Sequence, residues 1–233
     1  MSADQFPDIL PGAEPDPALL ERIAGSVTRD LKPVKPVPSA GLTVSRLLAG
    51  FLAVAVLGGA ILGFFGVIKL SAGAIALIFP ALAGLALLAA AASANAMIPG
   101  SKRPFHPAVL TAAGCAVMAA EFVLLFHDHS LGNYVPEGVT CLKAGLLWSV
   151  PAAIFAWLLL RRGYAVDRTA AGAAAGTFAG LAGLTVLELH CANFRMWHVV
   201  VWHLAVVPIA AALAAVVYFS FFGSKRKDAE LMQ

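Results

Sequence analysis

The chain has 233 residues, of which 60% are hydrophobic and only 12% are charged, and its mean hydropathy is +0.85. Soluble domains are about 25% charged, so this composition excludes an ordinary water-soluble globule, a disordered chain and a nucleic-acid-binding protein with a basic surface. Its three cysteines are too few for a disulfide scaffold and do not fit a structural zinc cluster. We therefore expect a helical integral membrane protein.

The first forty residues precede the long apolar segments and carry one short helical pattern. Asp16 followed by Pro17 is typical of a helix N-terminus. The apolar residues that follow fall on one stripe: Leu20, Ile23, Ala24, Val27 and Leu31. The prolines at positions 33, 36 and 38 then end the pattern and indicate a semi-rigid spacer.

A helix of four turns is only marginally stable alone in water, so this stripe needs a surface to bind. We expect a cytoplasmic protein partner that takes the helix in a groove, through Leu20, Ile23, Val27 and Leu31. The membrane surface is an alternative, although the polar face is mixed in sign rather than strongly basic. An incidental folded tail is a third interpretation.

Six segments are long and apolar enough to cross a bilayer, which takes about 20 residues. They are residues 47–68, 73–97, 107–126, 139–160, 169–189 and 199–222. The predicted fold is therefore all-α, a six-helix transmembrane bundle with a short N-terminal cytoplasmic amphipathic helix. The predicted divisions are a partner-docking segment and linker over 1–40, the transmembrane domain over 41–223 and a basic cytoplasmic tail over 224–233.

The positive charges predict the orientation of the bundle. Thirteen of the 16 Lys and Arg residues fall on the side that holds both termini, and only Lys69, Lys143 and Arg195 lie on or near the other side. Cytoplasmic loops carry the excess of Lys and Arg, so both termini are predicted to be cytoplasmic. The localisation expected is the inner membrane of a bacterium.

Small residues and prolines within the spans predict how the helices pack. Gly172, Gly176 and Gly180 recur every four residues on the fifth span, a spacing that lets two helix backbones approach closely. Prolines lie within spans two, four and six, at positions 80, 151 and 208, where we expect kinks or hinges.

The predicted outer side gathers most of the chain's histidine and cysteine. Its sulfur groups are Cys141 and Cys191, whereas Cys115 is expected to be an apolar packing residue. The candidates for a metal-binding or polar cluster there are Glu121, His127, His129, Glu188, His190, His198 and His203. The cysteines are candidates for a disulfide, for a soft-metal site with nearby imidazoles, or for reactive thiols. Histidines snorkelling at the interface are the alternative that needs no function, and His198 and His203 lack the i, i+4 spacing of two ligands on one helix face.

Several short motifs stand out in this topology. They are Asp30-Leu31-Lys32-Pro33-Val34-Lys35-Pro36-Val37-Pro38, Gly138-Val139-Thr140-Cys141-Leu142, Leu160-Arg161-Arg162-Gly163-Tyr164, Ala171-Gly172-Ala173-Ala174-Ala175-Gly176, Leu189-His190-Cys191 and the aromatic segment from Trp197 to His203. With these motifs the chain resembles the NrsF family of membrane anti-sigma factors. The resemblance implies that the N-terminal segment holds an extracytoplasmic-function sigma factor at the inner membrane. It also implies release on periplasmic or membrane stress, heavy metals included, with Cys141 and Cys191 as sensing residues. The chain has more histidine than this resemblance leads us to expect.

The sequence thus favours a regulator over an enzyme, with the lipid bilayer and a sigma factor as partners, no direct nucleic-acid contact and no resident cofactor beyond transient binding of a soft metal. A membrane redox protein that binds haem or a quinone through the outer cysteines and histidines is the first alternative. A small metal transporter is the second, although polar residues within the spans are few.

Overall fold

A computed structural model of the chain describes residues 16–29, 38–98, 100–101, 106–161, 163, 165 and 167–230, without the side chains of residues 27, 29 and 221–230. The chain divides into two compact units, Met1–Pro36 and Val37–Gln233. Regular structure in the described part is helical apart from one isolated bridge between Asp128 and Arg195. Six helices are long and apolar enough to cross a membrane, which confirms the predicted fold class.

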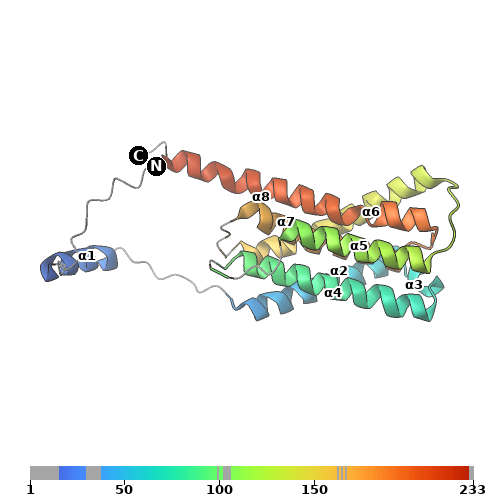
Figure 1. Cartoon of the computed structure of the whole chain (residues 1–233), viewed down its shortest axis with the longest axis horizontal. Helices are drawn as coiled ribbons and strands as arrows, with labels where there is room; N and C mark the ends of the chain where they lie inside the picture. Colours follow the sequence, from blue (N-terminus) through green and yellow to red (C-terminus); the bar gives the residue numbers. More distant parts are fainter. Residues whose placement is uncertain are drawn as a thin grey trace. The chain divides into compact units, whose positions relative to one another are not determined.

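The first unit contains α1, Pro17–Arg29 (Figure 1). The side chain of Asp16 accepts a hydrogen bond from the Ala18 amide at 2.9 Å, so Asp16 satisfies one of the amides that a helix start leaves free. Leu20 and Ile23 are both about half exposed and form an apolar face on the helix. The side chain of Val27 and the whole of Leu31, also predicted on this stripe, lie outside the described residues.

The second unit is a bundle in which the spans run side by side (Figure 1). Its elements are α2 Ala40–Leu62, α3 Phe65–Lys69, α4 Ala72–Ala96, α5 Pro107–Leu125, α6 Tyr134–Leu160, α7 Arg168–His190, a π-helix η2 at His198–His203 and α8 Val206–Glu230. The first span runs from 40 to 62, earlier than the predicted 47–68. Gly63, at a φ of 96°, ends α2, and the short helix α3 follows it.

The helix α7 lies at the centre of the bundle and packs against α2, α3, α4, α5, α6 and α8. Of its most apolar segment 94% is buried, against 39% or less in the other five spans. The glycine stripe explains the tight packing against α8. A Cβ at Gly172 would stand 2.7 Å from the Ala214 carbonyl oxygen, and one at Gly180 would stand 2.7 Å from the Cα of Val207. The predicted close approach at this stripe is therefore present, with α8 as the neighbour.

The predicted prolines lie in two different settings. Pro80 and Pro151 lie inside α4 and α6, respectively. Pro208 is the third residue of α8, five positions after the last residue of the π-helix. Because proline has no N–H to donate one turn back and its ring crowds that carbonyl, irregular hydrogen bonding before Pro208 is physically reasonable.

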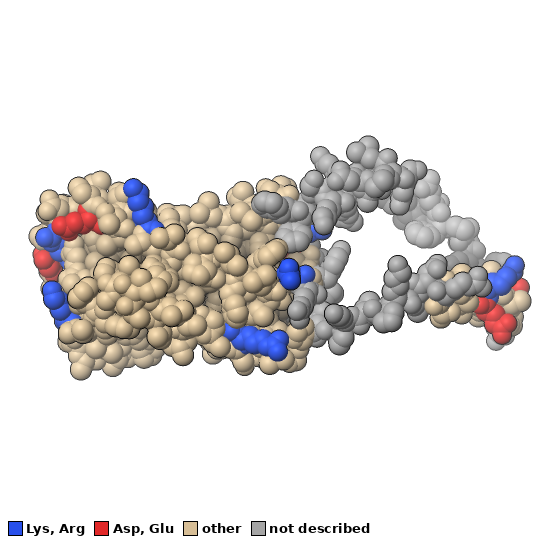
Figure 2. Space-filling view, turned by 180° about the vertical axis from the view of Figure 1, so that it is seen from behind, with Lys and Arg blue, Asp and Glu red and all other residues tan. Residues whose placement is uncertain are grey.

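The connectors define two ends of the bundle. We call the end with residues 63–71, 126–133 and 191–197 the cysteine end, and the end with residues 97–98, 100–101, 106, 161, 163, 165 and 167 the opposite end. Figure 2 shows that the middle of one face carries almost no charged side chain, whereas charged groups gather towards the two ends. This distribution suits a bundle whose middle lies in hydrocarbon.

Candidate functional site: a buried cysteine and histidine cluster

Four residues from three parts of the chain meet at the cysteine end. Cys141 lies two turns into α6, and Cys191 is the residue that caps the C-terminus of α7. His198 and His203 are the first and last residues of the π-helix. We call these four residues the Cys–His cluster. Their potential ligand atoms, one from each side chain, all lie within 4.8 Å of one another.

The contacts within the cluster are close and mostly hidden from solvent. The Sγ atoms of Cys141 and Cys191 are 3.6 Å apart and both thiols are free, while the Cys191 Sγ lies 3.7 Å from Nε2 of His198. The rings of His198 and His203 meet edge to face with centroids 5.1 Å apart. His198 is 2% exposed and His203 only 1%, so these are not histidines that snorkel towards the interface.

A buried carboxylate holds one of the two histidines. Oε1 of Glu188 lies 2.7 Å from Nδ1 of His203, and Glu188 is only 1% exposed. Nε2 of His203 is buried and has no hydrogen-bond partner among the described residues. A carboxylate that accepts from Nδ1–H leaves the lone pair of a neutral ring on Nε2. The Nε2 of His203 is thus a buried basic nitrogen without a partner.

The electrostatic setting favours a thiolate at Cys191. The Cys141 thiol, and after it the imidazole of His198, stabilise that thiolate and lower the pKa of Cys191, although burial opposes the shift. A deprotonated sulfur beside imidazole nitrogens is able to bind a metal ion, attack an electrophile or join a second thiol after oxidation.

Polar and aromatic contacts fix the connector that carries Cys191. Asn193 donates to the carboxylate of Glu137 on α6 at 2.7 Å, and Arg195 lies 3.5 Å from the same oxygen. The rings of Phe194 and Phe126 stack with centroids 5.4 Å apart. These contacts tie the 191–197 connector to the start of α6 and to the end of α5.

The other predicted candidates lie outside the Cys–His cluster. His127 and His129 are exposed in the connector between α5 and α6, and Glu121 is half-buried on α5. His190 is half-buried, and its Nδ1 lies 3.2 Å from the Gly63 carbonyl oxygen. Of the seven candidates, the structure brings His198 and His203 into the cluster and places Glu188 beside it.

The sequence interpretation of His198 and His203 was wrong in one respect. Two residues that are five positions apart on an α-helix point about 140° away from each other, so the missing i, i+4 spacing argued against a shared site. In the π-helix, hydrogen bonds run from i to i+5, and this wider turn brings residues 198 and 203 to the same face. The two imidazoles are those that the predicted soft-metal site required beside Cys141 and Cys191.

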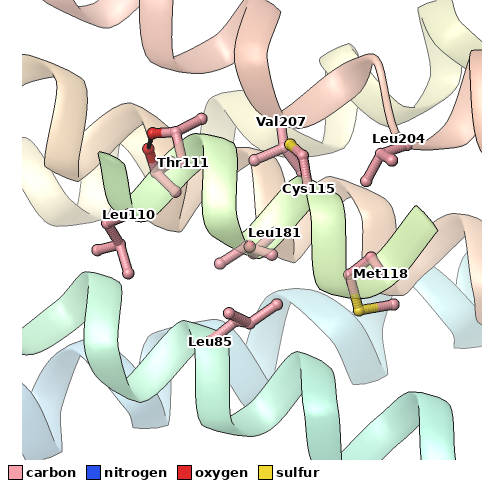
Figure 3. A pocket seen from close by; sticks show the side chains of 10 residues that line it. Leu85, Leu110, Thr111, Cys115, Met118, Leu181, Leu204 and Val207 are labelled. Atoms are coloured by element: carbon pink, nitrogen blue, oxygen red, sulfur yellow. Dashed lines mark hydrogen bonds between the residues drawn. The ribbon is translucent and has the colours of Figure 1, made fainter. Parts of the chain in front are cut away.

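The best-defined pocket in the described part of the chain lies elsewhere, between α4, α5, α7 and α8 (Figure 3). It is a small hollow whose lining is apolar except for Thr111, Thr177 and Cys115. The hydroxyls of Thr111 and Thr177 form a hydrogen bond at 2.6 Å. Cys115 lies in this pocket among apolar side chains, in agreement with its predicted packing role.

Comparison with known proteins gives one match, to a protein-family model. No curated protein and no solved structure matches the chain significantly. A family model described as negative regulator of sigma F matches residues 27–221, which is most of the chain and includes all four residues of the Cys–His cluster. With six helices able to span a membrane and this match, the chain belongs to the NrsF family of anti-sigma regulators.

Proposed function

We propose that this protein is an inner-membrane anti-sigma factor that holds an extracytoplasmic-function sigma factor through α1 and releases it when a periplasmic stress acts at Cys141 and Cys191. The Cys–His cluster carries this proposal, because it is a buried group of reactive side chains built from three separate elements. The family supplies the regulatory role, and the sites and the signal are our assignment.

The exposed apolar face of α1 supports the docking part of the proposal. Leu20 and Ile23 are each about half exposed on a helix with one capped end. A short amphipathic helix gains most of its stability from packing, so a groove on a partner protein would both order α1 and cover this face. The partner would then be sterically prevented from reaching polymerase or promoter.

The charge distribution supports the proposed orientation. Thirteen of 16 Lys and Arg residues belong to the side of the termini, so the cysteine end faces the periplasm in this arrangement. Compounds that enter the periplasm would approach the bundle from that end. The docking helix lies in the compartment where sigma factors act.

The packing of α7 supports transmission between the two sides. Cys191 directly continues α7, which packs against every other span, and His203 leads through two residues into α8. A change of bonding at the cluster would shift α7 and α8 against each other along their glycine stripe. Typical coupling between linked sites of this kind is about 1–3 kcal/mol.

The docking part is tested by affinity purification of the full-length protein in mild detergent, followed by mass spectrometry. Leu20→Asp with Ile23→Asp is expected to lose the sigma factor and to derepress its target genes. The matched control, Ala18→Asp with Ser26→Asp, adds the same charge on the other face of α1. It is expected to retain the sigma factor and to keep the target genes repressed. Equal capture by the two variants would refute docking through the apolar face.

The sensing part is tested separately with a transcription reporter in stressed cells. Cys141→Ser with Cys191→Ser is expected to remain repressed under stress that releases the parent protein. Cys115→Ser, which alters a cysteine outside the cluster, is expected to respond as the parent does. A normal response by the double cysteine variant removes the sensing role while leaving the docking role intact.

A further inference from the structure

We propose that the Cys–His cluster is a four-ligand site for a divalent cation of the zinc type, and that Glu188 positions His203 as one of its ligands. The inference rests on the proposed function, whose signal site it specifies. It adds three residues, Glu188, His198 and His203, to the two cysteines and assigns each a task.

The spacing of the donor atoms agrees with tetrahedral coordination. Zinc binds thiolate sulfur at about 2.3 Å and imidazole nitrogen at about 2.0–2.1 Å, so neighbouring donors stand about 3.8 Å apart for two sulfurs and about 3.5 Å for sulfur and nitrogen. The Cys141 and Cys191 sulfurs are 3.6 Å apart, and the Cys191 sulfur lies 3.7 Å from the His198 nitrogen. Small side-chain movements would complete the geometry.

The fourth ligand is the Nε2 nitrogen of His203. Its side chain is 1% exposed, and its Nδ1 is hydrogen-bonded to Glu188. Its Nε2 has no hydrogen-bond partner in the described part of the chain. An unpaired buried nitrogen is unfavourable unless a ligand meets it. A carboxylate bonded to the second nitrogen of a metal-binding histidine fixes the ring's tautomer and orientation, which is the geometry of Glu188.

The charges of the site also suit a divalent cation. Two thiolates and two neutral imidazoles around a doubly charged ion give a neutral centre, which is favourable for a buried position. Binding would release the thiol protons to the solvent. Sulfur and imidazole donors favour zinc-type ions over Mg²⁺ and Ca²⁺, which take oxygen ligands.

A metal at this place would join three elements through coordinate bonds. It would link α6 through Cys141, the end of α7 through Cys191 and the start of the α8 span through the two histidines. Occupancy would therefore fix the spacing of these three elements. Gain or loss of the ion would then change how these three elements pack within the bundle.

The experiment uses the reduced full-length protein in detergent and titrates it with Co²⁺ alone, then with Zn²⁺ as competitor and Mg²⁺ as the hard-cation control. We expect one Co²⁺ per chain, with a thiolate-to-cobalt charge-transfer band and visible bands of tetrahedral intensity that Zn²⁺ abolishes and Mg²⁺ leaves unchanged. Absence of the thiolate band in the reduced parent protein would overturn the inference.

Matched variants identify the ligands. Cys141→Ser and His203→Gln are expected to lose the tetrahedral spectrum, whereas Cys115→Ser and His190→Gln are expected to keep it. If His203→Gln keeps the parent spectrum and affinity, the four-ligand assignment is wrong. Circular dichroism of the metal-free variants separates loss of a ligand from loss of the fold.

The positioning role of Glu188 has its own readout. Glu188→Ala is expected to weaken Co²⁺ binding about 10- to 100-fold with unchanged stoichiometry. Glu188→Gln, whose amide oxygen still accepts from Nδ1, is expected to recover part of the loss, and Glu121→Ala serves as the control at a carboxylate outside the cluster. An unchanged affinity in Glu188→Ala removes this role.

The metal titration and the sigma-factor capture fail independently. A protein that captures the sigma factor but binds no Co²⁺ retains the proposed function and loses this inference. A protein that binds Co²⁺ at the four ligands but captures no sigma factor retains the metal site and loses the docking role.

Discussion

Gly66 lies directly against the backbone of Cys191, where a Cβ on residue 66 would stand 2.7 Å from the Cys191 carbonyl oxygen. The same Cβ would stand 2.7 Å from the carbonyl oxygen of Glu188. Both neighbours are backbone atoms, which cannot turn away as a flexible side chain can. The short helix α3 therefore supports the end of α7 that carries the cluster, and only glycine permits this distance.

Replacing Gly66 by alanine is expected to disturb the site without altering any ligand. The added methyl group pushes α3 away from the end of α7, displaces Cys191 and Glu188, and lowers Co²⁺ affinity by about tenfold, as loss of other supporting contacts does. Cobalt titration of the purified variant measures the change. Gly73→Ala is the control, because only a Ser71 oxygen at 4.0 Å lies near its Cβ position; equal affinities in the two variants would contradict the support role.

The glycine stripe of α7 is expected to dominate the stability of the bundle. A Cβ at Gly176 would collide with the backbone of α8 at Ala210 and Ala211, so Gly176→Ala is expected to destabilise by about 1–3 kcal/mol. Gly84 on α4 has nothing within 4 Å of its Cβ position, and Gly84→Ala is expected to change stability by less than about 1 kcal/mol. Thermal unfolding in detergent, followed by circular dichroism, compares them. A loss at Gly84 as large as that at Gly176 would rule out a special role for the stripe.

The cap of α1 is expected to affect the affinity for the sigma factor. Asp16→Ala removes a cap whose loss destabilises a helix by about 1 kcal/mol, so the partner must order a less stable helix and affinity falls about fivefold. Asp16→Asn keeps a side-chain oxygen that accepts the amide hydrogen bond and is expected to bind like the parent. Titration of the purified sigma factor onto each full-length variant in detergent gives the two affinities. If alanine and asparagine weaken binding equally, the charge of Asp16 matters instead of its cap.

The proposed orientation predicts which positions a membrane-impermeant maleimide reaches from outside the cell. In a background without native cysteines, His129→Cys at an exposed position of the cysteine end is expected to be labelled once the outer membrane is permeabilised. Ser101→Cys at the opposite end is expected to be labelled only after the inner membrane is opened. The reverse pattern would place the cluster in the cytoplasm and exclude a periplasmic signal.

Hydropathy predicts this fold well because a bilayer imposes one requirement on every span. Each span must contain about 20 apolar residues between polar connectors, and all six spans were found on that basis. Small residues at intervals of four identified the contact surface of α7 for the same kind of reason, since a helix repeats nearly every four residues. The end of the first span was placed too late because the break at Gly63, with its positive φ, depends on the local backbone.

The site was only partly predictable because its residues are distant in sequence. Cys141 and Cys191 are separated by 50 positions, and nothing in their local patterns shows that α6 and α7 bring them together. Both histidines were named as candidates, but their shared face was not predicted because the standard helical period was assumed where the chain forms a π-helix. The nearby Pro208 was a usable signal, since proline near a span terminus often accompanies irregular hydrogen bonding.

The burial of α7 also separates this helix from the lipids. With 94% of its most apolar segment covered by the other helices, α7 has almost no surface on which acyl chains act. Changes in bilayer thickness, fluidity or headgroup composition therefore reach it only through the five surrounding spans. The helix that Cys191 caps is thus largely insulated from the physical state of the membrane.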